Sequence, residues 1–236
     1  MGWVEVMVQL IARWVHRIEE SIHELSSTRL LSAINKEAAD KGDLPNLLII
    51  SNGQFPKNDF VLEDGLMRVN GGKAIVPNVV KTVEIARQRG ILVVWVVREH
   101  DPLGRDVECF RRHLYPPGKV GPTSKGSEGA KLVDGLEIKD GDYKLVKTRF
   151  SAFFATHLHS FLQSAGIDSL VIVGVQTPNC IRQTVFDAVA LDYESITVLV
   201  DATAAATPDI HIANIFDMKN VGVATPSIEE WSEADA

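Results

Sequence analysis

The sequence predicts an α/β fold of three layers, in which helices cover both faces of a mostly parallel sheet. Two observations lead to this prediction. First, short apolar runs rich in β-branched residues, such as 91–97 and 170–173, are typical of strands buried on both faces. Second, segments of helical periodicity separate these runs, and strands that alternate with helices favour parallel pairing through crossover connections.

The elements follow one another in a regular order. Apolar side chains share one helical face over 1–25, so we interpret 1–45 as a helical extension, packed on the body or on a partner subunit, ahead of a domain at 46–236. A turn is expected at 51–54, and loops at 58–72 and 101–128, the second with a short helix near 107–113. The expected strands are 47–50, 91–97, 143–147, 170–173, 196–200 and 221–224. The expected helices are 74–89, 151–165, 178–191, 208–218 and 228–231.

Composition limits the classes of function. The net charge of −7 does not favour nucleic-acid binding, and the hydrophobic content of 45% supports a sizeable core. No apolar run reaches membrane-spanning length, so we expect no membrane contact. The two cysteines, Cys109 and Cys180, lie far apart in the sequence. We therefore expect free thiols in a reducing compartment, and the cytoplasm is the expected location.

Cys180 lies where a buried strand is expected to meet a helix. Gly174 ends the apolar run, and Pro178 suits the first turn of a helix with Thr177 as its N-cap. Such a turn offers free N–H groups and the positive end of the helix dipole, which stabilise a thiolate and a developing oxyanion. The alternative is an inert buried thiol, because free cysteines are commonly buried, and it stays open at this point.

Lys147 is the last residue of the predicted strand 143–147, and Cys180 follows the end of another predicted strand, 170–173. Ligands of such sheets bind beyond the carboxyl ends of the strands, so we expect the two side chains within a few ångströms of each other. An ammonium there would stabilise the thiolate, although a solvated strand-end lysine is the alternative. Phe150 and Phe153 would wall a small substrate pocket or pack in the core, and Arg98 would face the same site.

A metal site is the less favoured interpretation. His100, Asp101 and His113 are residue types that bind metals, and a metal site needs several such ligands brought together. No tight ligand motif, such as a pair of histidines at helical spacing, appears in the sequence. We therefore expect neither a metal nor another cofactor.

Four segments together carry the pattern of a known family. They are N-D-F at 58–60, V-W-V-V at 94–97, K-T-R-F-S-A-F at 147–153 and G-V-Q-T-P-N-C at 174–180. On these segments the chain resembles the isochorismatase-like cysteine hydrolases, and plant members in particular, from about Asn58 to Trp231. The resemblance implies a six-stranded parallel sheet.

The resemblance also implies roles for individual residues. It implies Cys180 as the nucleophile and Lys147 as its electrostatic partner. It further implies a cis peptide bond between Val175 and Gln176, directly before Thr177. The N–H groups of Gln176 and Cys180 would then form an oxyanion hole.

The activity implied by the resemblance is hydrolysis of a small amide or carbamoyl C–N bond through a thioester. The substrate would be a small amide or ureido compound, and whether the chain forms a homo-oligomer is left open. Nicotinamidases carry an Asp-x-His metal element after the second strand. The sequence here is Arg98-Glu99-His100, so nicotinamide is disfavoured. Isochorismatases proper lack the cysteine, so cleavage of a vinyl ether is disfavoured as well.

One catalytic residue of the family is missing. The family has an aspartate after its first strand, in a pattern similar to I-D-M-Q-N-D-F. The corresponding position here is Phe55 without a gap, or Ser51 or Asn52 after the first strand. The resemblance stops abruptly before Asn58, which we interpret as an alternative first exon or a misjoined gene model.

Asp59 is the nearest acid and the candidate substitute. Without the family's aspartate we predict impaired catalysis. The alternative function is a non-catalytic protein of the same fold that binds a small ligand or a partner chain.

Overall fold

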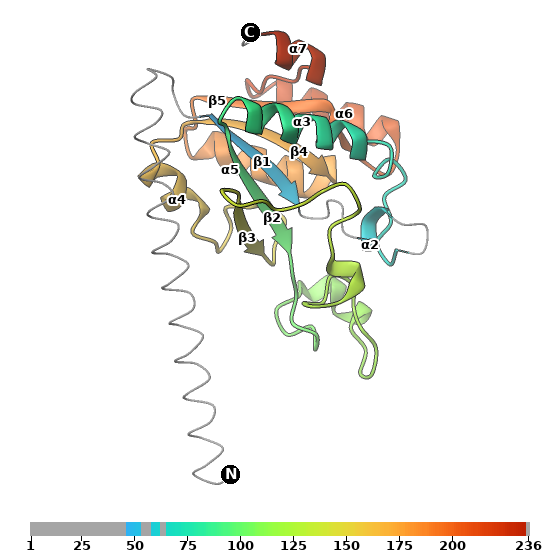
Figure 1. Ribbon diagram of the computed structural model, residues 1–236. Coiled ribbons are helices and arrows are strands. Elements are labelled where there is room, and N and C mark those ends of the chain that lie inside the picture. The colour runs from blue at the N-terminus through green and yellow to red at the C-terminus, as the bar shows by residue number, and fades with distance from the viewer. Residues whose placement is uncertain (1–45, 53–57, 62–64, 235–236) are drawn as a thin grey trace. The chain divides into compact units, whose positions relative to one another are not determined.

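The structure is a computed structural model that describes residues 46–52, 58–61 and 65–234 (Figure 1). The expected helical extension at 1–45 lies outside the described residues, so it and its boundary with the following domain stay predictions. The described strands and helices all belong to one compact unit, Leu44–Ala236. None of the helices in the described part of the chain is long and apolar enough to cross a membrane.

Five strands form the sheet in the described residues, and every neighbouring pair is parallel. The order across the sheet is β3-β2-β1-β4-β5, so β1 is the central strand. The α/β class predicted from the alternation of strands and helices is therefore confirmed. The strands are β1 (Asn46–Asn52), β2 (Leu92–Arg98), β3 (Tyr143–Lys147), β4 (Ser169–Val175) and β5 (Ser195–Ala204).

The expected strand at 221–224 is reduced to a single bridge beside β5. The N–H of Ala224 donates to Ile196 O at 2.9 Å, and the N–H of Val198 donates to Ala224 O at 2.8 Å. One more bond follows, from the N–H of Val200 to Pro226 O at 3.0 Å, but Pro226 has no N–H to return a bond to β5, so the bonds do not alternate further. The count of six strands is thus not confirmed within the described residues.

Helices occupy most of the positions that helical periodicity predicted. One exception is α2, a single turn within a segment expected to be a loop. The helices are α2 (Asn58–Val61), α3 (Val76–Gln88), α4 (Leu158–Ser164), α5 (Arg182–Ala190), α6 (Pro208–Lys219) and α7 (Ile228–Ala234). Short 3-10 helices span Cys109–Leu114 and Glu128–Ala130.

Buried residues on both faces of the sheet produce the layers. Trp95 of β2 belongs to one core cluster with residues of α3 and α7, and these two helices contact each other. Val94 and Val96 are equally buried, and alternation along a strand directs them to the other face. Helices α5 and α6 contact each other and β5. Figure 1 shows the parallel strands with helices packed along the sheet.

The predicted helix at 151–165 begins late, at Leu158. Side-chain hydrogen bonds explain the difference. The hydroxyl of Ser151 accepts from the N–H of Phe153 at 3.1 Å, and the hydroxyl of Thr156 donates to Ala152 O at 2.6 Å. Such local bonds compete with the backbone bonds of a helix. Ala155 also has a φ of 54°, which a right-handed helix excludes.

Candidate active site

The turn that carries Cys180 lies between β4 and α5. The peptide bond between Val175 and Gln176 is cis, at the position where the resemblance placed one. Residues Thr177–Ile181 form a π-helical turn, and Cys180 within this turn is completely buried. The side chain of Cys180 therefore lies beyond the carboxyl end of β4, in the first helical turn after the strand.

Thr177 is not the N-cap that the sequence predicted, because it lies inside the turn and its hydroxyl contacts α6 instead. Its Oγ1 lies 2.8 Å from Nδ1 of His211. Burial lowers the pKa of His211, so the neutral ring can accept this hydroxyl proton. The carbonyl of Gln176 accepts from the N–H groups of Asn179 and Ile181 at 3.1 and 3.2 Å. His211 was missed in the sequence because nothing near it in the chain marks a partner.

Lys147 lies next to Cys180. The side chain is 1% exposed, hydrogen-bonds the side chain of Cys180 and donates to the carbonyl of Phe150. Burial lowers the pKa of Lys147 to about 8, while the charge of Cys180 acts in the opposite direction. At neutral pH the side chain is therefore still largely an ammonium ion. The structure thus brings together the two residues that were expected at the carboxyl edge of the sheet, although two strands lie between β3 and β4.

The buried ammonium should leave a signature in the pH dependence of stability. Between pH 8 and 10.5 the unfolded chain holds a proton on Lys147 that the folded chain has lost, so the free energy of unfolding should rise with pH in this window. The full rise corresponds to roughly 3 kcal/mol. Urea unfolding of the parent and of Lys147→Met across this range measures the difference. Parallel pH profiles of the two proteins would contradict it.

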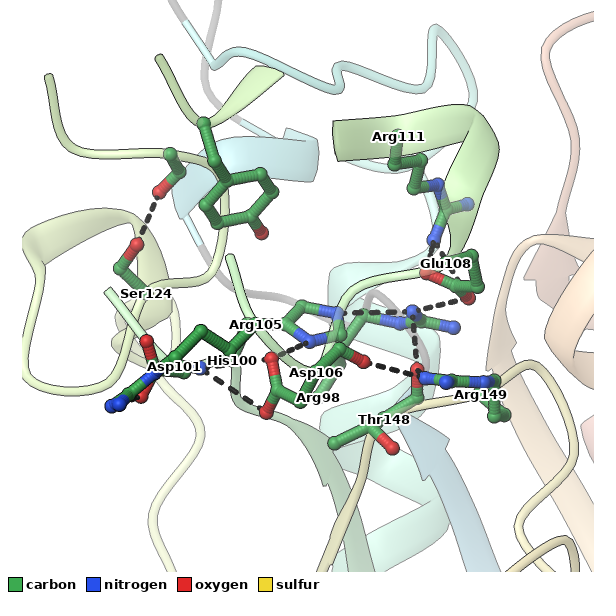
Figure 2. Close-up of polar contacts among 12 residues, drawn as sticks. Arg98, His100, Asp101, Arg105, Asp106, Glu108, Arg111, Ser124, Thr148 and Arg149 are labelled. Carbon is green, nitrogen blue, oxygen red and sulfur yellow. Dashed lines mark hydrogen bonds and ion pairs between the residues drawn. The ribbon is translucent and has the colours of Figure 1, made fainter. Parts of the chain in front are cut away.

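Two buried arginines share one carboxylate beside this pair. We call Arg98, Glu108 and Arg111 the arginine cluster. Figure 2 shows Arg98 and Arg111 approaching Glu108 from different segments, with Nη1 atoms 2.8 and 3.4 Å from Oε1 of Glu108. Burial alone would raise the pKa of Glu108, but the charge and hydrogen bond of Arg98, together with the charge of Arg111, outweigh burial and lower this pKa. Glu108 is therefore ionised at neutral pH.

The arginine cluster lies within electrostatic range of Cys180. Burial and Arg98 lower the pKa of Arg111, while Glu108 and Cys180 raise it. The ring of Phe150 lies 5.6 Å from the guanidinium carbon of Arg98 and 5.0 Å from that of Arg111. Arg98 and Phe150, both predicted as pocket residues, are thus brought together.

Phe153, the third predicted pocket residue, packs elsewhere. Its ring lies 5.6 Å from the ring of Tyr193 and 6.5 Å from that of His159. Arg111 and Glu108, in contrast, were missed. The sequence placed a short helix near them but gave no sign of which charged side chain in this loop is buried.

The residues considered for a metal site have other partners. His100 is buried, with Nε2 lying 3.2 Å from Arg98 Nη1 and Nδ1 lying 3.1 Å from Asp106 Oδ1. Burial, and then Arg98, lower the pKa of His100. Asp101 pairs with Arg105, and His113 is exposed. No group of three metal-ligating side chains occurs in the part of the chain that the structure describes.

We accordingly predict that chemistry at Cys180 is insensitive to chelators. The guanidinium of Arg98 occupies the space next to Nε2 of His100, and its positive charge opposes a cation there. Incubation with EDTA followed by dialysis should change the alkylation rate of Cys180 by less than about twofold, well below the effect of losing a catalytic group. Loss of reactivity that zinc restores would contradict this prediction.

Asp59, the candidate substitute acid, is bound to a loop. Its Oδ2 accepts a hydrogen bond from the N–H of Thr123 at 2.7 Å. A Cβ at Gly129 would clash with the same oxygen, so this segment passes directly against the carboxylate. Within the described residues, then, its hydrogen bond supports the loop, and a catalytic role of Asp59 stays a prediction.

The end of β1 lies at the centre of the site. Ser51 pairs with Val96 of β2 and with Gly174 of β4, so the last residues of β1 lie between the strands that carry Arg98 and lead to Cys180. Neither Ser51 nor Asn52 provides a carboxylate. The strand order therefore indicates where an acid would have to stand, and the sequence lacks one there.

Known proteins resemble this chain over most of its length. A family model of the isochorismatase domain matches residues 48–230. A probable inactive nicotinamidase of Arabidopsis thaliana is 70% identical over 178 residues, which are 75% of this chain and 91% of that protein. A ureidoacrylate amidohydrolase of Agrobacterium fabrum is 30% identical over 166 residues, which are 64% of this chain and 72% of that protein. The crystal structure of an isochorismatase family protein from Desulfovibrio vulgaris has a TM-score of 0.75 and 39% identity, covering 81% of this chain and 97% of that one.

Proposed function

This chain belongs to the isochorismatase family of hydrolases, as its motifs predicted, and from that membership we propose that it cleaves the C–N bond of a small amide or carbamoyl compound through Cys180. The observation that supports the proposal most is the buried contact between Lys147 and Cys180. A thiolate is the nucleophilic form of cysteine, and an adjacent ammonium stabilises it.

The proposed reaction has two halves. The thiolate of Cys180 attacks the carbonyl carbon, and the tetrahedral intermediate expels the amine, which takes up a proton, to leave a thioester. Water then attacks the thioester and loses a proton, which releases the acid and the thiol. The N–H groups of Gln176 and Cys180 are proposed to hold the negative oxygen in both halves.

Proton transfer is the weak point of this site. The leaving amine must gain a proton, and the attacking water must lose one. An ammonium at Lys147 cannot accept the proton that the water loses. Glu108 is ionised but is held between Arg98 and Arg111, which makes it a poor base. We therefore propose that turnover is impaired.

A non-catalytic protein that binds a small ligand or a partner chain is the second candidate function. Two observations favour it: the end of β1 lacks an acid, and the Arabidopsis relative is named as probably inactive. Both candidates retain the fold and the site, so neither of these separates them. The enzyme requires a reactive thiolate at Cys180, and the non-catalytic protein does not.

The pH dependence of alkylation separates the two candidates. An ordinary thiol reacts about fiftyfold more slowly with iodoacetamide at pH 6.5 than at pH 8.5, because its thiolate population falls. For Cys180 in the proposed enzyme we expect a decrease of less than about fivefold. Cys109 is exposed and serves as the internal reference when mass spectrometry resolves the two sites. A fiftyfold decrease at Cys180 would favour the non-catalytic candidate.

A screen of small amides and ureido acids is the direct test of substrate class.

We further propose that the chain works in the cytoplasm, because both cysteines are free. We propose no nucleic-acid partner, in line with the net charge of −7.

A further inference from the structure

We propose that the substrate carries a carboxylate, and that Arg111 binds this carboxylate while the amide carbon lies at Cys180. The inference rests on the proposed function, because it names the substrate class of the same site. It would make the preferred substrate the half-amide of a small dicarboxylic acid or a similar carboxylate-bearing amide.

Arg111 is the guanidinium of the arginine cluster that is free to take a second acceptor. It is 7% exposed, and its Nη1 lies 3.4 and 3.5 Å from the two carboxylate oxygens of Glu108. These distances are at the limit of hydrogen bonding, whereas Arg98 lies 2.8 Å from the same residue. A guanidinium has five N–H donors in a planar fork that matches a carboxylate. Arg98 therefore fixes Glu108, and Arg111 can turn its donors to an incoming anion.

The balance of charge around Cys180 favours an anionic ligand. Among the described residues, Arg98, Arg111 and Lys147 are three buried cations near the thiol, and Glu108 is the carboxylate between the arginines. Formation of the thiolate still leaves one positive charge in excess. A buried cation is stable only when it is paired, so a ligand carboxylate would complete the cluster.

Phe150 restricts where the carboxylate can lie. Its ring lies 5.0 Å from the guanidinium carbon of Arg111 and 5.6 Å from that of Arg98, which holds both groups against one apolar wall. Lys147 donates to the carbonyl of the same residue. Phe150 thus connects the arginines to the Lys147–Cys180 pair, and a ligand beside it can contact both.

Calorimetric titration of the full chain carrying Cys180→Ala tests the inference without turnover. The probes are oxamate, malonamate and succinamate, each compared with its neutral diamide, and inorganic phosphate as a second anion. We expect at least one of the half-amides to bind about tenfold or more tightly than its diamide. Arg111→Met should weaken binding of that half-amide about 10- to 100-fold and leave the diamide unchanged. Arg111→Lys keeps the charge but not the planar fork of donors, so its affinity for the half-amide should lie between those of the chain with Arg111 intact and of Arg111→Met.

Arg112→Met is the matched control, because this neighbour in the same 3-10 helix is exposed, and it should bind as the parent does. Thermal unfolding of each variant verifies the fold. Any of four results would overturn the inference: equal binding of acid and diamide, no binding of any acid, no effect of Arg111→Met on binding, or tighter binding of phosphate than of every half-amide. Alkylation of Cys180 tests the proposed function separately, so failure of one is distinguishable from failure of the other.

Discussion

Replacing Lys147 with methionine is expected to slow the alkylation of Cys180 at pH 7 by about 10- to 1000-fold, because an opposite charge within about 4–6 Å changes an ionised population by that factor. Lys147 hydrogen-bonds the thiol in a site where both side chains are buried, so water cannot replace its charge. Methionine keeps most of the volume of the lysine stem, and the cavity left behind is small. Turnover of any substrate should fall in parallel.

The matched control lies on the same strand. Lys144 of β3 is exposed and pairs with Glu99, so Lys144→Met removes the same charge from the strand without touching the site. In Lys144→Met the alkylation rate of Cys180 should equal that of the parent. The alkylation rate of exposed Cys109 should be the same in the parent and in both variants. Equal slowing of Cys180 by both substitutions would mean that net charge, and not the contact, controls the thiol. No slowing by either would end the case for Lys147 as its partner.

The sheet could be predicted because burial on both faces requires unbroken apolar runs. The burial of residues 92–97 of β2 is the direct counterpart of the apolar run in the sequence. The contact of Lys147 with Cys180 could be predicted for a related reason, since the carboxyl ends of parallel strands meet at one edge. The boundary of α4 could not, because hydroxyl side chains such as Thr156 offered the backbone local partners that periodicity does not detect.

The burial of Arg111 and its place in the site could not be predicted from the sequence. It stands next to Arg112 in a charged loop, and the two residues are identical in type. Only the contacts of the folded chain distinguish them: Arg111 meets Glu108 and the ring of Phe150, while Arg112 is exposed. Phe150 comes from a distant part of the chain, so no local pattern in this loop could indicate it.

Restoring an acid at the end of β1 is expected to raise turnover by about 10²- to 10⁴-fold, the usual contribution of general acid–base catalysis. The change is to replace residues 51–57 with Asp-Met-Gln, which gives the spacing of the family between Ile50 and Asn58. The register of β1 supports the position. The first residue of the new segment would take the place of Ser51, which pairs with β2 and β4 between the strands that carry Arg98 and lead to Cys180. A carboxylate there could accept the proton of the thiol, pass it to the leaving amine and then activate water.

The comparison uses a half-amide or ureido acid that a family member hydrolyses, with kcat/KM measured for the parent and the replaced chain, and each again with Cys180→Ala. The same replacement with Asn-Met-Gln restores the spacing but not the charge, so it separates repair of the strand end from supply of the acid. Full activity in the Asn-Met-Gln chain would show that spacing alone was at fault. Equal rates in the parent and the Asp-Met-Gln chain, both lost with Cys180→Ala, would mean that another group, with Asp59 the first candidate, already serves as the base. Equal rates that survive Cys180→Ala would exclude Cys180 as the nucleophile.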